Sequence, residues 1–371
     1  MNKKKIGILS MQRIKNYGSF LQAYGLRKLI EELGYEVQYV DYHVEEPVIK
    51  DSINGKNDKI SKALKTFEGD APFIQKFQYI IHKKNFGKKY YSVLGLTEEP
   101  NYNPELDTLV IGSDEVFNCI QSNKNVGYSL ELFGKDNKAK KLITYAASFG
   151  NTTVEKLEKY NKKEEISELL NKFDKISARD SNTGKIVEEI SNQKVVYNLD
   201  PVLAYDYMKK CDKIPDIAIN EKYIIVYAYS NRISAEESKY IKEFAKKNNL
   251  KVYSIGGAQK CADKFIDCSP FEVLGYFRKA EMVITDTFHG SIFSIIAKRN
   301  FVTLVRKSVG NAYGNEEKLT DLLERLKLTD RITYNIENIN SILDKKIDYE
   351  KVEEILKLQR NISRKYLEEN L

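Results

Sequence analysis

Residues 5–41 read KIGILSMQRIKNYGSFLQAYGLRKLIEELGYEVQYVD and indicate the fold more clearly than any other stretch. The apolar run of residues 5–10 predicts a β-strand, residues 19–33 predict a helix with Gly34 directly after it, and residues 35–41 predict a second strand. A helical crossover joins parallel strands, because antiparallel strands need only a short turn. The stretch therefore predicts a βαβ unit and, with it, an α/β fold.

The loop of residues 13–18 connects the first predicted strand to the helix. Ligands of open α/β sheets collect beyond the carboxyl ends of the strands, which is where this loop begins. Its residues Asn16, Tyr17 and Gly18 are therefore candidates for substrate binding.

Strand and helix patterns alternate in two series, with a looser, charged stretch between them. They predict an N-terminal Rossmann-like domain of residues 1–207 and a C-terminal one of residues 208–345, in which residues 269–272 (Ser-Pro-Phe-Glu) form a capped helix start. Residues 45–102 are rich in Lys and Asn and predict a helical excursion of the first domain, and residues 346–371 predict an amphipathic closing helix that packs back on it. The remaining strands are predicted at residues 108–111, 141–147, 175–178, 194–197, 223–229, 251–255, 282–285 and 301–305.

Size and composition agree with a globular protein of two domains. A chain of 371 residues exceeds what one hydrophobic core supports. Hydrophobic residues make up 42% of it, which excludes a disordered or fibrous class. The net charge of +7 arises from lysines that alternate with glutamates along helices, so a solvated surface is favoured over nucleic-acid binding.

Cysteine usage and hydropathy indicate the compartment. The four cysteines form no C-x-x-C pair, and the apolar run near the N-terminus is too short for a signal peptide. No stretch reaches the ~20 apolar residues that cross a bilayer. We expect a cytoplasmic protein without a structural metal and with at most peripheral contact with a membrane.

A turn in the second domain is the sharpest local signal for a site. It contains Asp286, Thr287 and His289, and Gly290 and Ser291 stand at the start of an apolar helix. Free amides at a helix start bind anions, so a phosphate suits this turn. A histidine there can act as a general acid or base. The alternative is that Asp286 and His289 only cap the helix and hold the turn together.

Arg179 directly follows a predicted strand in a chain that has 11 Arg against 49 Lys. A planar guanidinium suits bidentate capture of a carboxylate or phosphate. Arg179 can equally pair with Asp180 or Asp200 at the edge of the sheet. Ser113, Asp114 and Asp200 also follow predicted strands and are candidates for substrate binding, although such side chains are more often caps and turns.

Several stretches, taken in their order along the chain, resemble the bacterial polysaccharide pyruvyl transferase family. Each stretch is short, but the ordered set is fairly specific and covers nearly the whole chain. The stretches are NYGSFLQAY (16–24), IGSDEVFN (111–118), YAASFG (145–150), SARD (177–180), LDPV (199–202) and TDTFHGSI (285–292).

The resemblance implies a reaction and a fold. Members of the family move the pyruvyl group of phosphoenolpyruvate onto two hydroxyls of one sugar of a cell-surface polysaccharide or its precursor, giving a cyclic ketal and phosphate. Their fold looks like a GT-B glycosyltransferase, with two Rossmann-like domains that face a cleft. The first domain would then take a glycan or lipid-linked sugar acceptor and the second the donor, without a cofactor or metal.

The resemblance also implies roles for individual residues. His289 matches the family histidine at the donor site and Arg179 the arginine after the corresponding strand, so we expect Arg179 to hold the carboxylate or phosphate of the donor. The amides of Gly290 and Ser291 would bind phosphate, and Asp114 and Asp200 would contact the acceptor.

One departure concerns the donor. Some family members carry Arg-Leu-His where this chain has Thr287-Phe288-His289, so one donor-binding cation is missing. Arg13, Lys15 and Arg306 are candidates to replace it.

Two other classes of protein fit parts of the pattern. A GT-B-type glycosyltransferase that uses a nucleotide sugar would share the fold, and nucleotide-sugar binding would distinguish it. A sugar-binding protein without enzymatic activity would bind without turnover, and those of the secreted kind need an export signal.

Overall fold

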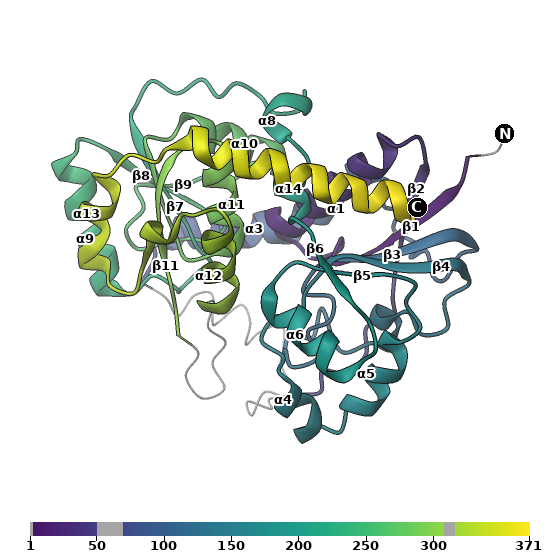
Figure 1. Cartoon of the computed structure of the whole chain (residues 1–371). Coiled ribbons are helices and arrows are strands. Elements are labelled where there is room, and N and C mark those ends of the chain that lie inside the picture. Colours follow the sequence, from purple (N-terminus) through teal and green to yellow (C-terminus); the bar gives the residue numbers. More distant parts are fainter. Residues whose placement is uncertain (1–2, 50–69, 308–315) are drawn as a thin grey trace. The chain divides into compact units, whose positions relative to one another are not determined.

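The computed structural model of the chain describes residues 3–49, 70–307 and 316–371, and these fold into two α/β units (Figure 1). The chain leaves the first unit and returns to it twice. Within the described ranges, unit 1 comprises residues 3–49, 91–205 and 354–371, and unit 2 comprises residues 70–90, 206–307 and 316–353.

Unit 1 is built on a six-stranded sheet with the order β2-β1-β3-β4-β5-β6, in which all neighbouring strands are parallel. The apolar side chains of the central strands are buried, as in parallel sheets that are covered on both faces. The strands are β1 (Lys5–Leu9), β2 (Glu36–Val40), β3 (Leu106–Asp114), β4 (Ala139–Ala147), β5 (Ile176–Ala178) and β6 (Val195–Tyr197).

Several helices of unit 1 begin at side-chain caps in the loops that precede them. Asn16 Oδ1 accepts a hydrogen bond from the amide of Ser19 (2.7 Å), and Asp180 Oδ1 accepts one from the amide of Thr183 (2.9 Å). Gly34, with φ of +91°, forms the left-handed turn after the first helix. The helices are α1 (Tyr17–Glu31), η1 (Tyr91–Leu94), η2 (Leu130–Phe133), α4 (Val154–Lys159), α5 (Lys163–Leu170), α6 (Ser181–Ile190) and α7 (Pro201–Ala204).

The closing helix α14 (Tyr349–Asn370) begins in unit 2, and its part from Glu354 onward belongs to unit 1. There the hydroxyl of Ser363 accepts a hydrogen bond from the amide of Leu199 (3.0 Å), and the hydroxyl of Tyr366 donates to the carbonyl of Thr144 (2.8 Å). The prediction that a C-terminal helix packs back on the N-terminal domain is confirmed.

Unit 2 repeats the architecture with a second parallel sheet, in the order β12-β11-β10-β7-β8-β9. Together, the two sheets with their helices confirm the predicted α/β fold with two Rossmann-like domains. The strands are β7 (Tyr223–Tyr227), β8 (Lys251–Ile255), β9 (Lys264–Phe265), β10 (Met282–Thr285), β11 (Asn300–Leu304) and β12 (Ile332–Thr333).

The helices of unit 2 include the predicted capping box. Ser269 Oγ accepts from the amide of Glu272 (3.2 Å), and the Glu272 carboxylate accepts from the amide of Ser269 (2.7 Å). No helix within the described ranges is long and apolar enough to cross a membrane. The helices are α3 (Phe73–Tyr90), α8 (Tyr207–Lys210), α9 (Ala235–Lys247), α10 (Pro270–Lys279), α11 (Phe288–Ile296), α12 (Glu316–Arg325), η3 (Thr329–Arg331), η4 (Ile336–Asn338) and α13 (Ile339–Leu343).

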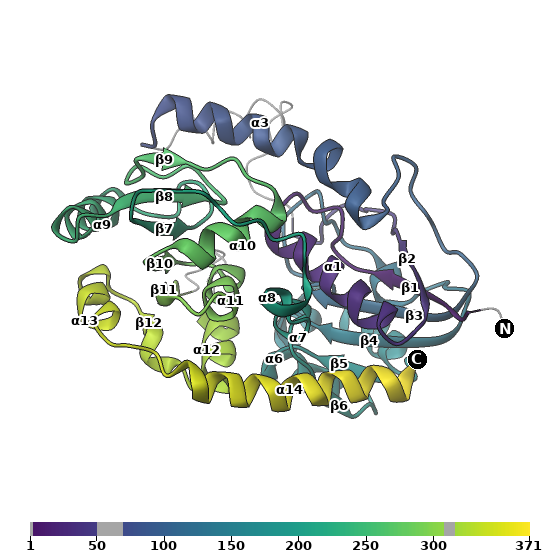
Figure 2. The same ribbon diagram turned by 90° about the horizontal axis from the view of Figure 1, so that it is seen from above.

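Helix α3 lies elsewhere than predicted. We expected the excursion of residues 45–102 in the N-terminal domain, but α3 belongs to unit 2, where it lies beside β9 (Figure 2). Gln75 Nε2 donates to the carbonyl of Ala262 (3.0 Å). The prediction failed because this contact joins residues far apart in the sequence. The part of the excursion from residue 50 to residue 69 lies outside the described residues.

Each sheet reverses its strand order once, beside its first strand. In unit 1 the order reverses between β1 and β3, and in unit 2 between β7 and β10. Connections that run to opposite sides leave a crevice at the carboxyl ends of these two strands, which is the preferred ligand site of doubly wound sheets. The candidate residues are therefore sought at these two positions.

Candidate functional site

Asp114 ends β3 beside the place where the strand order of unit 1 reverses, which we call the switch point. The hydroxyl of Ser19, in the first turn of α1, donates to Asp114 Oδ2 (2.7 Å), and the amide of Glu115 donates to Oδ1 (2.9 Å). Asn16 caps the same turn and contacts the hydroxyl of Ser19 with its Nδ2 (3.1 Å). The carboxylate remains 17% exposed, so it is oriented by the protein and still accessible to a ligand.

Arg179 follows β5 and is buried between two carboxylates. Its Nη1 lies 3.4 Å from Asp200 Oδ2 and 3.9 Å from Asp114 Oδ1. Burial alone would lower the pKa of Arg179, but Asp200 and Asp114 outweigh it and raise the pKa above its usual value. The guanidinium is therefore a permanent positive charge that holds two carboxylates of unit 1.

A chain of hydrogen bonds continues from Arg179 to α1. Gln22 Nε2 donates to Asp200 Oδ2 and lies 3.4 Å from Ser113 Oγ. Ser113 in turn donates to the carbonyl of Ala146 (2.8 Å). The predicted residues Ser113, Asp114, Arg179 and Asp200 thus meet in one polar network, in which Asp114 is the partly exposed member.

Tyr17 and Gly18 occupy a different position from the one expected. Both are buried in the first turn of α1, and the Tyr17 side chain is 2% exposed. They shape the turn that carries Ser19, and very little of their surface is accessible to a substrate.

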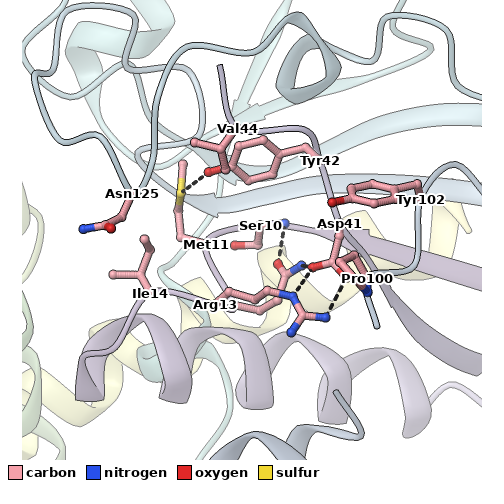
Figure 3. Close-up of a pocket in the computed structure, with 11 residues that line it drawn as sticks. Ser10, Met11, Arg13, Ile14, Asp41, Tyr42, Val44, Pro100, Tyr102 and Asn125 are labelled. Atoms are coloured by element: carbon pink, nitrogen blue, oxygen red, sulfur yellow. Dashed lines mark hydrogen bonds and ion pairs between the residues drawn. The ribbon is translucent and has the colours of Figure 1, made fainter. Parts of the chain in front are cut away.

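A pocket of about 140 Å³ lies one strand away, at the carboxyl ends of β1 and β2 (Figure 3). Arg13 and Asp41 both line this pocket, and Arg13 binds Asp41 through Nε (2.6 Å) and Nη2 (2.8 Å). Burial would raise the pKa of Asp41, but the hydrogen bonds from Arg13 and from the amide of Asn101 hold it below its usual value. Arg13 engages Asp41 through two nitrogens, so it would have to give up a bidentate ion pair to replace the missing donor-binding cation.

The turn after β10 forms the corresponding edge of unit 2. Thr287 caps α11, since its Oγ1 accepts from the amide of Gly290 (2.9 Å), and its carbonyl accepts from the amide of Ser291 (3.2 Å). Both amides thus have acceptors within the turn, which makes them less suited to bind phosphate than the sequence indicated. A Cβ at Gly290 would lie 2.0 Å from Thr285 Oγ1, so only glycine permits this close approach.

Asp286 is fully buried at the same strand end. Arg232, from the loop after β7, places its Nε 2.8 Å from Asp286 Oδ2 and is itself 30% exposed. Burial raises the pKa of Asp286, against the lowering effect of Arg232 and Arg306. Asp286 therefore acts as an anchor for Arg232, whose guanidinium reaches the surface.

His289 is the second residue of α11 and is half-buried. Its ring contacts Phe288, with ring centroids 5.4 Å apart, and Phe293, with centroids 5.9 Å apart. These contacts restrict the orientation of the imidazole at the start of the helix. The prediction had placed His289 at this strand-to-helix turn, two residues after Thr287.

Arg306, after β11, is engaged by an acidic residue. Its Nη1 and Nη2 contact the two carboxylate oxygens of Glu237, the second at 3.0 Å. Like Arg13, Arg306 holds its carboxylate through two nitrogens. Arg232 is in an ion pair as well, but its partner Asp286 lies three residues before His289, which makes Arg232 the better placed candidate for the missing cation.

Three residues of these sites were not among the sequence candidates. Ser19 and Gln22 both lie in the stretch 16–24 that carries the family resemblance. Ser19 also had a local signal, because an N-cap residue such as Asn16 binds the amide of the residue three positions later. Arg232 had no local signal, because its partner Asp286 is 54 residues away.

Solved structures similar to this chain include two UDP-N-acetylglucosamine 2-epimerases and a glycosyltransferase. A UDP-N-acetylglucosamine 2-epimerase is 9% identical over 100% of this chain and 95% of its own, with a TM-score of 0.51. A putative UDP-N-acetylglucosamine 2-epimerase from Listeria monocytogenes is 10% identical over 97% and 94%, with a TM-score of 0.49. The calicheamicin glycosyltransferase CalG4 is 11% identical over 100% and 98%, with a TM-score of 0.44. At such low identity the first of these shows likeness of fold alone, and it agrees with the predicted GT-B-like architecture.

Sequence comparison identifies the family. No curated protein sequence matches the chain significantly. The sequence model of the family described as polysaccharide pyruvyl transferase matches residues 16–308, which includes the strand-end residues of both units. The chain therefore belongs to the polysaccharide pyruvyl transferase family.

Proposed function

We propose that this protein transfers a pyruvyl group from phosphoenolpyruvate to two hydroxyls of one sugar, forming a cyclic ketal and releasing phosphate. The observation that carries the proposal is His289 at the start of α11, three residues after the Asp286–Arg232 ion pair, in a chain of this family. An imidazole and an accessible guanidinium at one strand end suit proton transfer next to an anionic substrate.

The reaction requires two additions at one carbon. The first sugar hydroxyl attacks C2 of phosphoenolpyruvate while C3 takes up a proton, so the CH₂ group becomes a methyl group. The bond from C2 to the phosphate oxygen then breaks, and the second hydroxyl attacks C2. Two C–O bonds form and one breaks. The two sugar hydroxyls lose two protons, which offset the one proton that C3 gains as it becomes a methyl group and one proton that is taken up by phosphate or a base.

In unit 2, His289 would handle protons and Arg232 would hold charge. A histidine can accept and donate a proton near neutral pH, so His289 can deprotonate a hydroxyl or protonate the departing phosphate. Arg232 would bind the donor's carboxylate or phosphate in place of the arginine that Thr287 replaces. Its ion pair with the buried Asp286 keeps the guanidinium in place before substrate binds.

In unit 1, Asp114 would accept a hydrogen bond from an acceptor hydroxyl. The carboxylate is held by Ser19 and by the charge of Arg179 and retains an exposed edge. Arg179 is buried, so we assign it to positioning Asp114 and Asp200 in place of the donor contact first expected from the sequence.

The acceptor would be a glycan or a lipid-linked sugar of a cell-envelope polysaccharide, taken up without a cofactor or metal. Because phosphoenolpyruvate is a cytoplasmic metabolite, the reaction would take place in the cytoplasm, with peripheral contact at the inner face of the membrane.

The direct test is phosphate release from phosphoenolpyruvate in the presence of candidate glycans. The wild-type protein should release phosphate only when a suitable glycan is present, and His289→Ala should lower the rate by about 10²–10⁴-fold. His43→Ala is the matched control, because His43 is an exposed histidine of unit 1 with 60% of its side chain accessible. Ordinary turnover by His289→Ala would remove His289 from the mechanism.

A ligand comparison separates the proposal from nucleotide-sugar transfer. A ligand at 100 times its dissociation constant stabilises the folded state by about 2.7 kcal/mol, which a thermal shift detects. Phosphoenolpyruvate should raise the melting temperature, whereas UDP-sugars at the same concentration should not. A rise in melting temperature with UDP-sugars but not with phosphoenolpyruvate would favour a glycosyltransferase.

A further inference from the structure

Helix α3 of unit 2 carries an exposed row of large apolar side chains. Phe73 is 69% exposed, Ile74 71%, Phe77 53% and Ile81 38%. Soluble proteins rarely expose several large apolar side chains side by side unless the surface has a partner.

The opposite side of α3 is already packed. His82 is buried and binds Asp267 through Nδ1 (2.6 Å), and Phe86 is fully buried beside it. The helix is therefore held in unit 2 by one side, along β9 (Figure 2), while its apolar row faces away from these contacts.

The exposed row continues into lysines. Residues three and four apart lie on one side of a helix, so Phe73, Phe77, Ile81, Lys84 and Lys88 form a single line, with Ile74 at its flank. Both lysines are exposed. We call these six residues the α3 stripe.

The charge of α3 has one sign. The helix has 18 residues, among them five lysines and no acidic residue. An apolar row with lysines and without acids matches an anionic, apolar partner. Negatively charged lipid bilayers have this combination, since lysines meet the headgroups while apolar side chains enter the boundary of the acyl chains.

We propose that the α3 stripe docks this protein on the surface of an anionic lipid bilayer. The helix would lie in the plane of the interface, with Phe73 and Phe77 inserted and Lys84 and Lys88 at the headgroups. This proposal extends the peripheral membrane contact of the proposed function but does not depend on pyruvyl transfer, so vesicle binding and phosphate release test the two proposals separately.

The first experiment uses the absence of tryptophan from the sequence. The full-length Phe77→Trp variant then has a single fluorophore on the α3 stripe. Its emission should shift to the blue with vesicles of phosphatidylcholine and phosphatidylglycerol, and should stay unchanged with phosphatidylcholine alone. Tyr334→Trp, at a position that is 54% exposed in the same unit, is the matched reporter and should not shift with either vesicle.

The second experiment measures binding of the full-length protein by sedimentation with the same vesicles at low salt. A lysine at an anionic surface contributes about fivefold to partitioning, so Lys84→Gln with Lys88→Gln should weaken binding about 25-fold. Phe73→Ser with Phe77→Ser should weaken it at least as much. Lys242→Gln with Lys246→Gln on α9 removes the same charge from exposed positions with the same spacing and should change binding less than threefold.

Three outcomes would overturn the proposal. They are equal binding to neutral and anionic vesicles, an equal loss in the α3 and α9 lysine variants, and a blue shift of Phe77→Trp that depends on protein concentration without vesicles. The last would assign the α3 stripe to a second copy of the chain.

Discussion

Asp114 and Asp286 occupy equivalent positions in the two units but have different surroundings. Each stands at the carboxyl end of the strand that lies across the switch point from the first strand of its sheet, and each has an arginine nearby. Asp114 is partly exposed and accepts a hydrogen bond from the hydroxyl of Ser19. Asp286 is fully buried and binds Arg232 at 2.8 Å.

The difference lies in which partner reaches the surface. In unit 1 the arginine is buried and the carboxylate is accessible, which suits a neutral ligand with hydroxyl groups. In unit 2 the carboxylate is buried and the arginine is accessible, which suits an anion. The same fold thus offers opposite charges at equivalent places, so the side chains, and not the architecture, decide the chemistry.

The largest effect is expected where unit 1 would lose its buried cation. Arg179→Met leaves Asp200, with 1% of its side chain exposed, without its charged partner, and should destabilise the fold by about 3–5 kcal/mol. Urea unfolding measures the change. Adding Asp200→Asn to Arg179→Met should restore part of the loss, and equal stability of the single and double variants would contradict the role of the pair.

The accessible cation of unit 2 should affect substrate binding more than folding. Arg232→Gln should weaken phosphoenolpyruvate binding about 10–100-fold, because one charge-assisted contact to the donor is lost. Isothermal titration with phosphoenolpyruvate measures it. Arg278→Gln, a half-exposed arginine of the same unit, serves as control, and equal affinities of the two variants would remove Arg232 from the donor site.

The pH dependence of stability should have opposite signs at two carboxyl groups. The pKa of Asp286 is raised, so its contribution to stability is fully present below its usual pKa of 3.8 and is lost as pH rises through the folded value. The pKa of Asp41 is lowered, so its contribution is present above 3.8 and is lost as pH falls. Urea midpoints measured between pH 3 and 8 report this dependence. Asp286→Asn should reduce the loss of stability as pH rises, and Asp41→Asn should reduce the loss of stability as pH falls. A similar pH profile for both variants would contradict this assignment.

The smallest effect is expected at the cap of α11. Thr287→Ala removes the acceptor for the amide of Gly290 and should lower stability by about 1 kcal/mol, whereas Thr287→Ser should retain most of it. Thermal unfolding distinguishes them. If Thr287→Ala lowered phosphoenolpyruvate affinity and left stability unchanged, the residue would be a ligand contact and not a cap.

Features that depend on neighbouring residues were predictable from the sequence. The strand and helix segments, the capping box at Ser269 and the turn at His289 follow from local patterns, because they depend on the spacing of side chains and on hydrogen bonds between residues a few positions apart. The parallel direction of the strands follows from the helical crossovers between them, although the paired residues are distant in the sequence, such as Ile6 of β1 and Thr108 of β3. The use of the Gly290 amide by Thr287 was also local, since the two residues have the spacing of a cap, but the phosphate interpretation passed over it.

Features that depend on distant partners were not predictable. The pairs Gln22–Asp200 and Arg232–Asp286 join residues 178 and 54 positions apart. For these two pairs, no pattern in the sequence specified the partner or which of the side chains would remain exposed. The pair of Arg179 with Asp200 was one of two alternatives that the sequence offered, and the structure shows it. The membership of α3 in unit 2 escaped prediction for the same reason.

The most direct test of the central claim is to follow phosphoenolpyruvate labelled with ¹³C at C3 in D₂O, with a glycan acceptor, by NMR. Addition of a proton to C3 during ketal formation predicts a glycan-bound methyl group that carries one deuterium and appears in step with phosphate. Phosphate released together with free pyruvate, or phosphoenolpyruvate that stays unchanged with every glycan tested, would contradict pyruvyl transfer.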